Sequence, residues 1–254
     1  MNVSADMLSL LLTLALAPRN VTFTVNGAER SMIIYGPSSI GKTGAPLVFG
    51  FHGHGGNARQ AARSFGLHEA WPEAIVVYMQ GIPTPGKTDP EGKKNGWQQS
   101  PGDVGDRDIK VFDAAYSWLL KNYSVDTKRV YSMGHSNGGR FTWLLWGLRG
   151  EKFAAFAPSA SPAGLFLAKA DPKPVFIVAG EKDQIVDFRG MQVSINGARR
   201  KLGITGTPVK NGYLTTEQGP NGLELVTYVH PGGHQFIGET VPMMVEFFKR
   251  HRQP

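Results

Sequence analysis

Cysteine is absent from the 254-residue chain, which excludes disulfides, thiol catalysis and cysteine-bound metal. The chain also lacks a Ser/Pro-rich linker, a charge block and an internal repeat, so nothing marks a boundary between two domains. Hydrophobic residues make up 41% of the chain, which is enough for one substantial core. We therefore expect a single domain over residues 21–254, preceded by a separate apolar segment over residues 1–20.

Acidic residues are fewer than basic ones, 20 against 27, and the formal net charge is +7. A basic chain could favour an anionic partner, but these bases are spread along the sequence. The densest groups, at residues 199–201 and 249–252, are short and lack the interleaved aromatics of a surface that binds single-stranded nucleic acid. Nucleic acid is therefore not an expected partner.

Lysine and arginine are also missing ahead of the first apolar run, at residues 7–17. This run resembles the apolar region of a signal peptide and ends in a small-residue A-x-A pattern, but it is too short for a stable membrane span. Asp6 opposes export, and Pro18 would obstruct cleavage after the run. Two hypotheses stay open: a leader of a secreted or periplasmic protein, and an N-terminal helix packed on the domain of a cytoplasmic one.

Two possible ligand-binding motifs lack part of the surroundings that binding requires. GPSSIGKT at residues 36–43 fits the phosphate-binding pattern G-x-x-x-x-G-K-[ST], but a working P-loop needs a helix directly after it. Pro46 and a strand-like apolar run follow instead, so we expect a turn between two strands and no bound nucleotide. His52 and His54 have no carboxylate or further histidine at close ligand spacing, so we expect neither a metal nor another cofactor.

Apolar strands alternate with helical segments from residue 21 onward. Several strand-like runs are almost continuously apolar, as expected for strands covered on both faces. Such alternation predicts the α/β class, a mostly parallel central sheet with helices on both faces, in which ligands gather at the carboxyl ends of the strands. The predicted strands cover residues 21–25, 32–35, 47–51, 75–78, 130–133, 153–157, 175–179 and 225–229, and the predicted helices cover residues 109–120, 140–148 and 240–248.

The strand at residues 130–133 runs into GHSNGG, residues 134–139, which fits the pattern G-x-S-x-G. In a nucleophile elbow, this sharp turn between a strand and a helix lifts the serine hydroxyl above the sheet, and the glycines avoid clashes. A helix is predicted directly afterwards, so the structural context fits as well. Ser136 is therefore the candidate nucleophile.

The loop HGHGGN, residues 52–57, follows another apolar strand and can point backbone N–H groups into the same site. In serine hydrolases of this layout, one oxyanion donor comes from such a loop and the second comes from the residue after the nucleophile. We therefore expect an oxyanion hole formed by the backbone N–H groups of His54 and Asn137, which would stabilise a tetrahedral intermediate.

Two further strand ends supply an acid and a base. A serine hydroxyl becomes nucleophilic when a neutral imidazole accepts its proton and a carboxylate orients that imidazole. The order Ser, Asp, His along the chain is that of the α/β-hydrolase fold. Asp183 is the preferred acid, with Asp187 and Glu181 as alternatives. His234 is the preferred base, whereas His230 stands at the strand terminus and better suits packing or a backbone hydrogen bond.

These motifs resemble a family of α/β-hydrolase esterases that includes polyhydroxybutyrate depolymerases, feruloyl esterases and LpqC-like lipoproteins. The resemblance covers most of residues 45–250. Besides the elbow, it rests on HGHGGN at residues 52–57, YMQG at 78–81, DVGDRD at 103–108, VDTKRVY at 125–131 and GH at 233–234. It implies the same triad of Ser136, Asp183 and His234, and it places Trp97 in a region that often lines the acyl pocket.

Trp97 has a second interpretation as an aromatic side chain that anchors a long loop. That loop, residues 81–108, is expected to shape the pocket. The chain departs from its relatives in lacking cysteines and in carrying Gln235-Phe236 after the histidine, where relatives often have tryptophan.

The sequence thus predicts a serine carboxylic-ester hydrolase that works through an acyl-enzyme and needs no cofactor. The resemblance implies hydroxycinnamoyl (feruloyl) or short polyhydroxyalkanoate esters as substrates, either as small molecules or attached to a polymer. An acyltransferase with the same nucleophile, a non-catalytic binding protein on a hydrolase scaffold and a peptidase are the alternatives.

Overall fold

The computed structural model describes residues 17–37 and 44–254. Within these ranges, ten strands form one sheet, and β5 (Ile82–Pro83) pairs with β6 (Asn95–Gly96) in a separate two-stranded ribbon. The strands of the large sheet are β1 (Arg19–Val25), β2 (Ala28–Tyr35), β3 (Ala45–Phe51), β4 (Ile75–Met79), β7 (Val125–His135), β8 (Ala155–Ser159), β9 (Val175–Gly180), β10 (Val209–Asn211), β11 (Leu214–Gln218) and β12 (Glu224–His230).

The strand order of the large sheet is β1-β2-β4-β3-β7-β8-β9-β12-β11-β10. The central strands from β4 to β12 run parallel to their neighbours. Antiparallel pairs flank them at both edges. The predicted α/β class with a mostly parallel central sheet is therefore confirmed, and the carboxyl ends of β3, β7, β9 and β12 meet along one side of the molecule.

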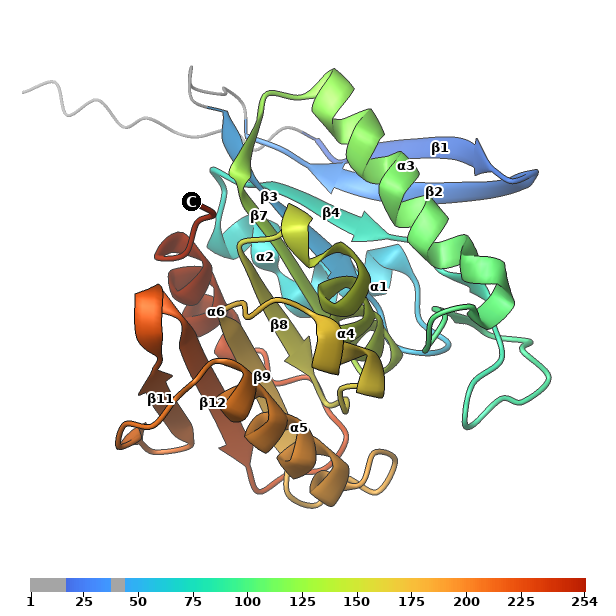
Figure 1. Ribbon diagram of the computed structural model, residues 1–254. Helices are drawn as coiled ribbons and strands as arrows, with labels where there is room; N and C mark the ends of the chain where they lie inside the picture. Colours follow the sequence, from blue (N-terminus) through green and yellow to red (C-terminus); the bar gives the residue numbers. More distant parts are fainter. Residues whose placement is uncertain (1–16, 38–43) are drawn as a thin grey trace, which may run out of the picture.

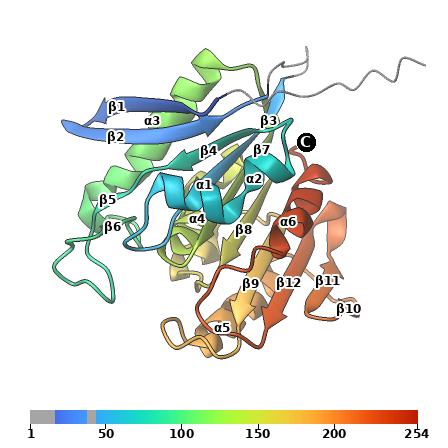
Figure 2. The ribbon, with the colours of Figure 1, turned by 180° about the vertical axis from the view of Figure 1, so that it is seen from behind.

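Helices cover both faces of this sheet. Figures 1 and 2 show α3, α4 and α5 on one face and α1, α2 and α6 on the other. The helices are α1 (Ala58–Phe65), α2 (Leu67–Ala70), α3 (Arg107–Asn122), α4 (Asn137–Arg149), α5 (Phe188–Lys201) and α6 (Thr240–Lys249).

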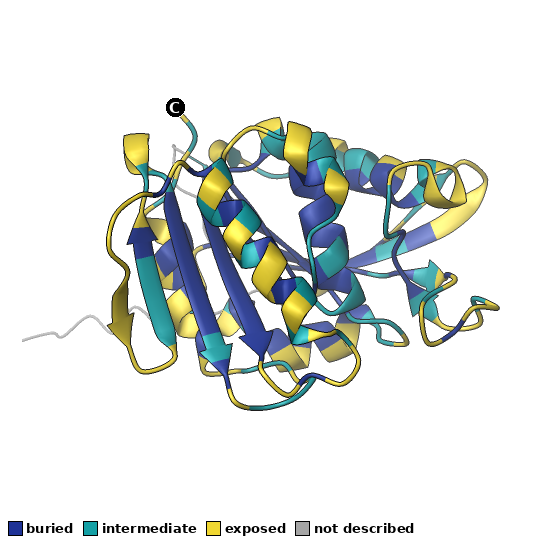
Figure 3. Cartoon of the chain, turned by 60° about the horizontal axis from the view of Figure 1, so that its bottom comes forward, coloured by how far each residue is buried: buried dark blue, intermediate teal, exposed yellow. Residues whose placement is uncertain are grey.

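Each face of the sheet has its own hydrophobic core, because successive side chains of a strand point to opposite faces. In β3, Phe49 contacts Phe112 of α3, and Phe51 contacts Phe141 of α4. Val48, the residue before Phe49, belongs to the core on the other face. Figure 3 shows the central strands buried and the edge strand β10 exposed. The central strands therefore lie between the two cores, which cover them on both faces.

Every strand and helix predicted from the pattern is present, with bounds that differ by a few residues. The largest difference is in β7, which begins at Val125 where the pattern predicted a strand from residue 130. The pattern missed the hairpin of β10 and β11 and the helices α1, α2 and α5. The reasons differ: β10 is exposed throughout, α5 buries only three of its 14 residues, Met191, Ser194 and Ala198, and α1 is only eight residues long with alanine at three of its four buried positions.

Two predictions fall partly or wholly outside the described ranges. Residues 1–16 hold most of the apolar N-terminal segment, so the leader and packed-helix hypotheses stay predictions. Residues 38–43 hold most of the phosphate-binding motif, but β3 begins at Ala45 and confirms that a strand follows it. Among residues 17–37 and 44–254, no helix combines the length and the apolar character that a membrane span requires.

Candidate active site

Ser136 lies in a strained turn between β7 and α4. Its φ of 58° and ψ of −120° are outside the regions that residues with a side chain usually adopt. Only glycine fits at two neighbouring positions: a Cβ on Gly134 would lie 2.3 Å from the carbonyl oxygen of Gly138, and a Cβ on Gly138 would lie 2.0 Å from that of Phe51. The predicted elbow therefore has the tight backbone that pushes a serine hydroxyl out of the turn.

Three side chains from separate strand ends form a continuous hydrogen-bonded row. The Oγ of Ser136 lies 2.7 Å from Nε2 of His234, and Nδ1 of His234 lies 2.7 Å from Oδ2 of Asp183. For Nε2 to accept the serine proton, Nδ1 must carry the ring hydrogen, and this N–H donates a hydrogen bond to the carboxylate. The structure thus brings together the hydroxyl, the imidazole and the carboxylate that were selected from the sequence.

Backbone groups hold the buried carboxylate of Asp183 in place. Its Oδ1 accepts hydrogen bonds from the N–H groups of Ile185 and Val186, at 2.9 and 2.8 Å, so Oδ2 is left for the imidazole. Asp187, the first alternative acid, instead caps α5 by accepting from the N–H of Arg189 at 2.9 Å. The geometry therefore favours Asp183 as the partner of the histidine.

The other two alternatives have structural roles in the same region. Nδ1 of His230 accepts a hydrogen bond from the N–H of Gly232 at 3.1 Å, which shapes the turn after β12. Desolvation lowers the pKa of His230, so this ring is neutral near pH 7. Glu181 is exposed, and its N–H donates to the carbonyl of His230. Neither residue belongs to the hydrogen-bonded row of Ser136, His234 and Asp183.

The two expected oxyanion donors flank the serine and are held by their side chains. His54 and Asn137 both line the cleft in front of Ser136. Asn137 begins α4, where first-turn N–H groups have no partner within the helix. Its Oδ1 accepts from the N–H of Trp97 at 2.7 Å, and its Nδ2 donates to the carbonyl of Trp97 at 2.9 Å. The ring of His54 is held by Asp89, with Nε2 and Oδ2 3.2 Å apart.

Trp97 does not line the acyl pocket, so that expectation is wrong. Its side chain is 0% exposed and lies against Phe51 and Phe141, with ring centroids 5.2 and 5.4 Å away. Its Nε1 donates to the carbonyl of His52 at 3.0 Å. The indole instead anchors the long loop in the core, because a large aromatic side chain gains most from complete burial when its N–H finds a partner.

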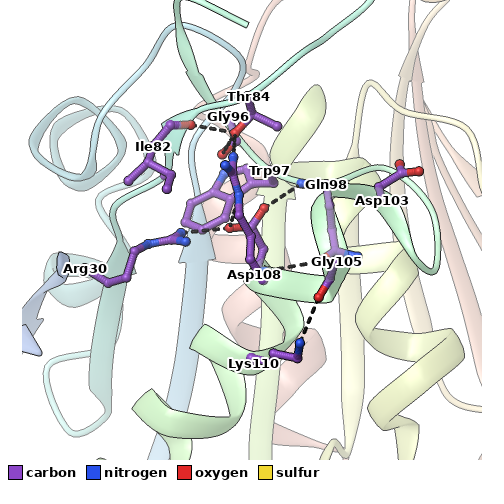
Figure 4. A network of polar contacts seen from close by, with 12 residues as sticks. Arg30, Ile82, Thr84, Gly96, Trp97, Gln98, Asp103, Gly105, Asp108 and Lys110 are labelled. Atoms are coloured by element: carbon purple, nitrogen blue, oxygen red, sulfur yellow. Dashed lines mark hydrogen bonds and ion pairs between the residues drawn. The ribbon is translucent and has the colours of Figure 1, made fainter. Parts of the chain in front are cut away.

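A buried ion pair fixes the same loop from its other side (Figure 4). Arg30 on β2 donates to Oδ1 of Asp108 at 2.8 Å, and Oδ2 of Asp108 accepts from the N–H of Gln98 at 2.8 Å. The Oε1 of Gln98 in turn accepts from the first backbone N–H groups of α3, at 3.1 and 3.2 Å. The loop at residues 81–108 is therefore tied both to β2 and to α3.

A cleft of about 380 Å³ opens in front of Ser136. One wall comes from the loop at residues 81–108, which agrees with the prediction that this loop shapes the pocket. The segment after Asp183 and the loop after β8 supply the opposite wall. The cleft is mixed in character, and its lining includes Lys87, Gln99, Arg140, Ser161, Ile185 and Val186.

Two histidines beside the triad are kept neutral by burial. Burial, with a smaller contribution from His234, lowers the pKa of His135 to about 4. Burial likewise lowers the pKa of His52 to about 4. The Nε2 of His52 accepts from the N–H of Gly81 at 2.9 Å, and Nδ1 of His135 lies 3.2 Å from Oγ of Ser159. The ring of His135, whose centroid lies 5.1 Å from that of His234, therefore adds no positive charge near pH 7 beside the candidate base.

Sequence reasoning missed three polar contributors to the site. Arg140 carried a usable signal, since it stands four residues after Ser136 and is the only charged residue among residues 137–148. Lys87 and Asp89 lie in a loop rich in glycine and proline, where spacing gives no information about which side chains turn inward. Within the described ranges, no three histidine or acidic side chains gather as a metal site would require.

Comparisons with known proteins agree with this architecture. Residues 91–181 match the prolyl oligopeptidase family. A bifunctional acetylxylan esterase/xylanase from Neocallimastix patriciarum is 29% identical over 170 residues, which are 65% of this chain and 23% of that protein. A relative from Nocardia uniformis subsp. tsuyamanensis is 28% identical over 161 residues, which are 59% of this chain and 44% of the relative. The chain thus spans less than half the length of either relative.

Solved structures share the fold over almost the whole chain. An acetyl xylan esterase from Aspergillus awamori superposes with a TM-score of 0.64 at 17% identity, covering 91% of this chain and 99% of that one. A ferulic acid esterase gives a TM-score of 0.65 at 15% identity, covering 92% and 97%. The fold and the site together define an α/β-hydrolase with the side-chain set of a serine hydrolase. Within this class, the narrower likeness to polyhydroxybutyrate depolymerases and LpqC-like lipoproteins stays a prediction.

Proposed function

We propose that this protein is a serine carboxylic-ester hydrolase that works through an acyl-enzyme. The observation that carries the proposal is the pair of 2.7 Å contacts that His234 makes with Ser136 and with Asp183. These distances suit proton transfer from the hydroxyl to the imidazole and orientation of the imidazole by the carboxylate. An ester is the simplest acyl donor that such a site can cleave.

In the proposed reaction, Ser136 Oγ attacks the ester carbonyl while Nε2 of His234 takes the hydroxyl proton. The N–H groups of His54 and Asn137 donate to the negatively charged oxygen of the tetrahedral intermediate. The carbon–oxygen bond to the alcohol then breaks, and His234 gives its proton to the leaving alkoxide. Water, deprotonated by the same ring, cleaves the acyl-enzyme and restores the serine.

For the substrate, we propose an acetyl or hydroxycinnamoyl (feruloyl) ester carried on a polysaccharide, with short polyhydroxyalkanoate esters as the second class. The names of the relative from Neocallimastix patriciarum and of the two solved structures support the first class. A cleft of about 380 Å³ matches the size of ordinary small-molecule sites. Polysaccharides that carry such esters occur outside the cell, and this fits the proposed secreted or periplasmic location.

The test is hydrolysis of p-nitrophenyl, acetyl, feruloyl and hydroxybutyrate esters by the intact protein and by Ser136→Ala. We expect the substitution to leave the fold intact and to lower turnover by about 10⁶, as loss of a triad nucleophile does in comparable enzymes. Ser117→Ala, at an exposed position on α3, is the matched control and should keep full activity. Equal activity of the Ser136 variant and the intact protein would refute the proposal.

Two added arms separate the alternatives. A prolyl peptide substrate addresses the family match at residues 91–181, and cleavage of the peptide without cleavage of any ester would favour a peptidase. An excess of sugar or alcohol acceptor addresses the acyltransferase. Acyl transfer to the acceptor in place of free acid would assign that outcome to the same nucleophile.

A further inference from the structure

Arg140 is a charged side chain inside the cleft that the proposed hydrolysis does not use. It lies one helical turn after Ser136 on α4, and both residues line the cleft. Its Nε donates to the carbonyl of Gln99 at 2.9 Å, and its Nη1 donates to the carbonyl of Pro162 at 3.0 Å. The guanidinium carbon lies 5.1 Å from the ring centroid of Phe166. The group is therefore held in one orientation, and Nη2 has no protein partner among the described residues.

Other arginines with low exposure are paired with carboxylates in this chain. Arg30 meets Asp108 at 2.8 Å, and Arg149 meets Asp113 at 2.6 Å. No such ion pair forms at Arg140 within the described ranges, although burial lowers its pKa and so disfavours its charge. A guanidinium stays protonated in proteins, so the cleft keeps a positive charge that has no ion-pair partner among the described residues.

No charged group forms an ion pair with Arg140 within the described ranges. Asp103, the acidic side chain that acts on it electrostatically, uses its Oδ2 to accept from two backbone N–H groups, at 2.8 and 3.2 Å. Asp187 caps α5. Lys87, on the wall formed by the loop at residues 81–108, donates to the carbonyl of Ile185 at 3.1 Å and adds a second positive charge. The cleft in front of the serine is thus suited to an anionic group.

We propose that Arg140, aided by Lys87, binds a carboxylate carried by the ester substrate, so that the preferred substrates are esters of acidic molecules such as uronic-acid-containing saccharides. The inference rests on the proposed esterase function and narrows its substrate class. A carboxylate matches the planar guanidinium, because its oxygens accept charge-assisted hydrogen bonds from Nη2. The carboxylate can belong to the alcohol part or to the acyl part of the ester.

The experiment compares esters that differ only in a carboxylate. The alcohol arm uses 4-acetoxybenzoate against methyl 4-acetoxybenzoate, and the acyl arm uses the p-nitrophenyl monoester of adipic acid against p-nitrophenyl hexanoate. We expect the intact protein to show a kcat/KM at least about 10-fold higher for the charged ester in one arm, as one charge-assisted hydrogen bond allows. The arm that shows the preference identifies which part of the substrate carries the charge.

Three variants identify the group responsible. Arg140→Gln should bring the ratio between charged and neutral ester to about 1, chiefly through KM, while Arg140→Lys should keep part of the preference because it keeps the charge. Arg200→Gln removes the same charge from an exposed position on α5 and should leave the ratio unchanged. A preference that survives in Arg140→Gln would overturn the assignment.

A measurement without variants guards against a folding defect in the Arg140 proteins. Benzoate should inhibit hydrolysis of the neutral ester competitively, and benzamide at the same concentration should not. Turnover of neutral esters with no preference in either arm and no benzoate inhibition would refute the carboxylate site while leaving the esterase proposal standing. Absence of any Ser136-dependent turnover would instead refute the esterase proposal itself.

Discussion

Replacing Trp97 separates its role as a core anchor from a role in the pocket. The indole is 0% exposed, packs against Phe51 and Phe141, and donates one hydrogen bond to the carbonyl of His52. Truncating a buried tryptophan to alanine costs about 3–5 kcal/mol through lost burial and the cavity that remains. Trp97→Phe keeps most of the packing but leaves the carbonyl of His52 unpaired, which costs about 1–3 kcal/mol.

Urea denaturation followed by fluorescence or circular dichroism gives these losses of unfolding free energy, and steady-state kinetics on one ester gives KM. We expect Trp97→Phe to lower the unfolding free energy with little change in KM. Ile185→Ala is the matched control, because Ile185 lines the cleft and is 46% exposed. That variant should raise KM and leave stability nearly intact. The reverse pattern, with a higher KM and full stability in Trp97→Phe, would refute the buried-anchor reasoning.

Two further predictions concern stability. Burial holds the pKa of His135 at about 4, so between pH 6.5 and 4 the unfolded chain binds a proton that the folded protein does not. His135 alone should therefore lower the free energy of unfolding with falling pH across this window by up to about 3 kcal/mol, in addition to the contribution of the similarly shifted His52, and urea titrations of His135→Gln should show a smaller fall. Asp108→Asn leaves Arg30 buried without its carboxylate and should cost about 3–5 kcal/mol in the same assay. Asp113→Asn breaks a partly exposed pair and should cost at most about 1 kcal/mol; equal losses in the two variants would contradict this account.

The features that the sequence predicted well are those with strong local rules. The central strands are nearly continuous apolar runs, and the elbow needs glycine at positions 134 and 138 because no Cβ fits there. Local rules also bring Ser136 and His234 to strand ends on the same side of a parallel sheet. The topology of the sheet places Ser136 and His234 close together, so this pair could be selected from the sequence alone.

The remaining features depend on contacts that local patterns do not record. Whether the loop residue Trp97 turns into the core or toward the cleft is decided by Phe51 and Phe141, which lie far away in the sequence. Arg30 and Asp108 are 78 positions apart, and neither residue has a local signal for burial. The helix α5 escaped prediction because its exposed face dominates its composition. Tertiary contacts overrode local propensity in each case.

The two hydrogen bonds between the Asn137 amide and the backbone of Trp97 also affect how the cleft can change between related proteins. It resembles the pairing of a neighbouring strand and fixes Asn137, a proposed oxyanion donor, from a point outside the tip of the long loop, residues 85–94. Insertions or exchanges in that tip can remodel the mouth of the cleft, and they would remove the contact of Asp89 with His54 and that of Lys87 with Ile185 while leaving Asn137 in place. Related proteins with this fold can therefore change which substrate binds in the cleft without changing the residues that cleave it.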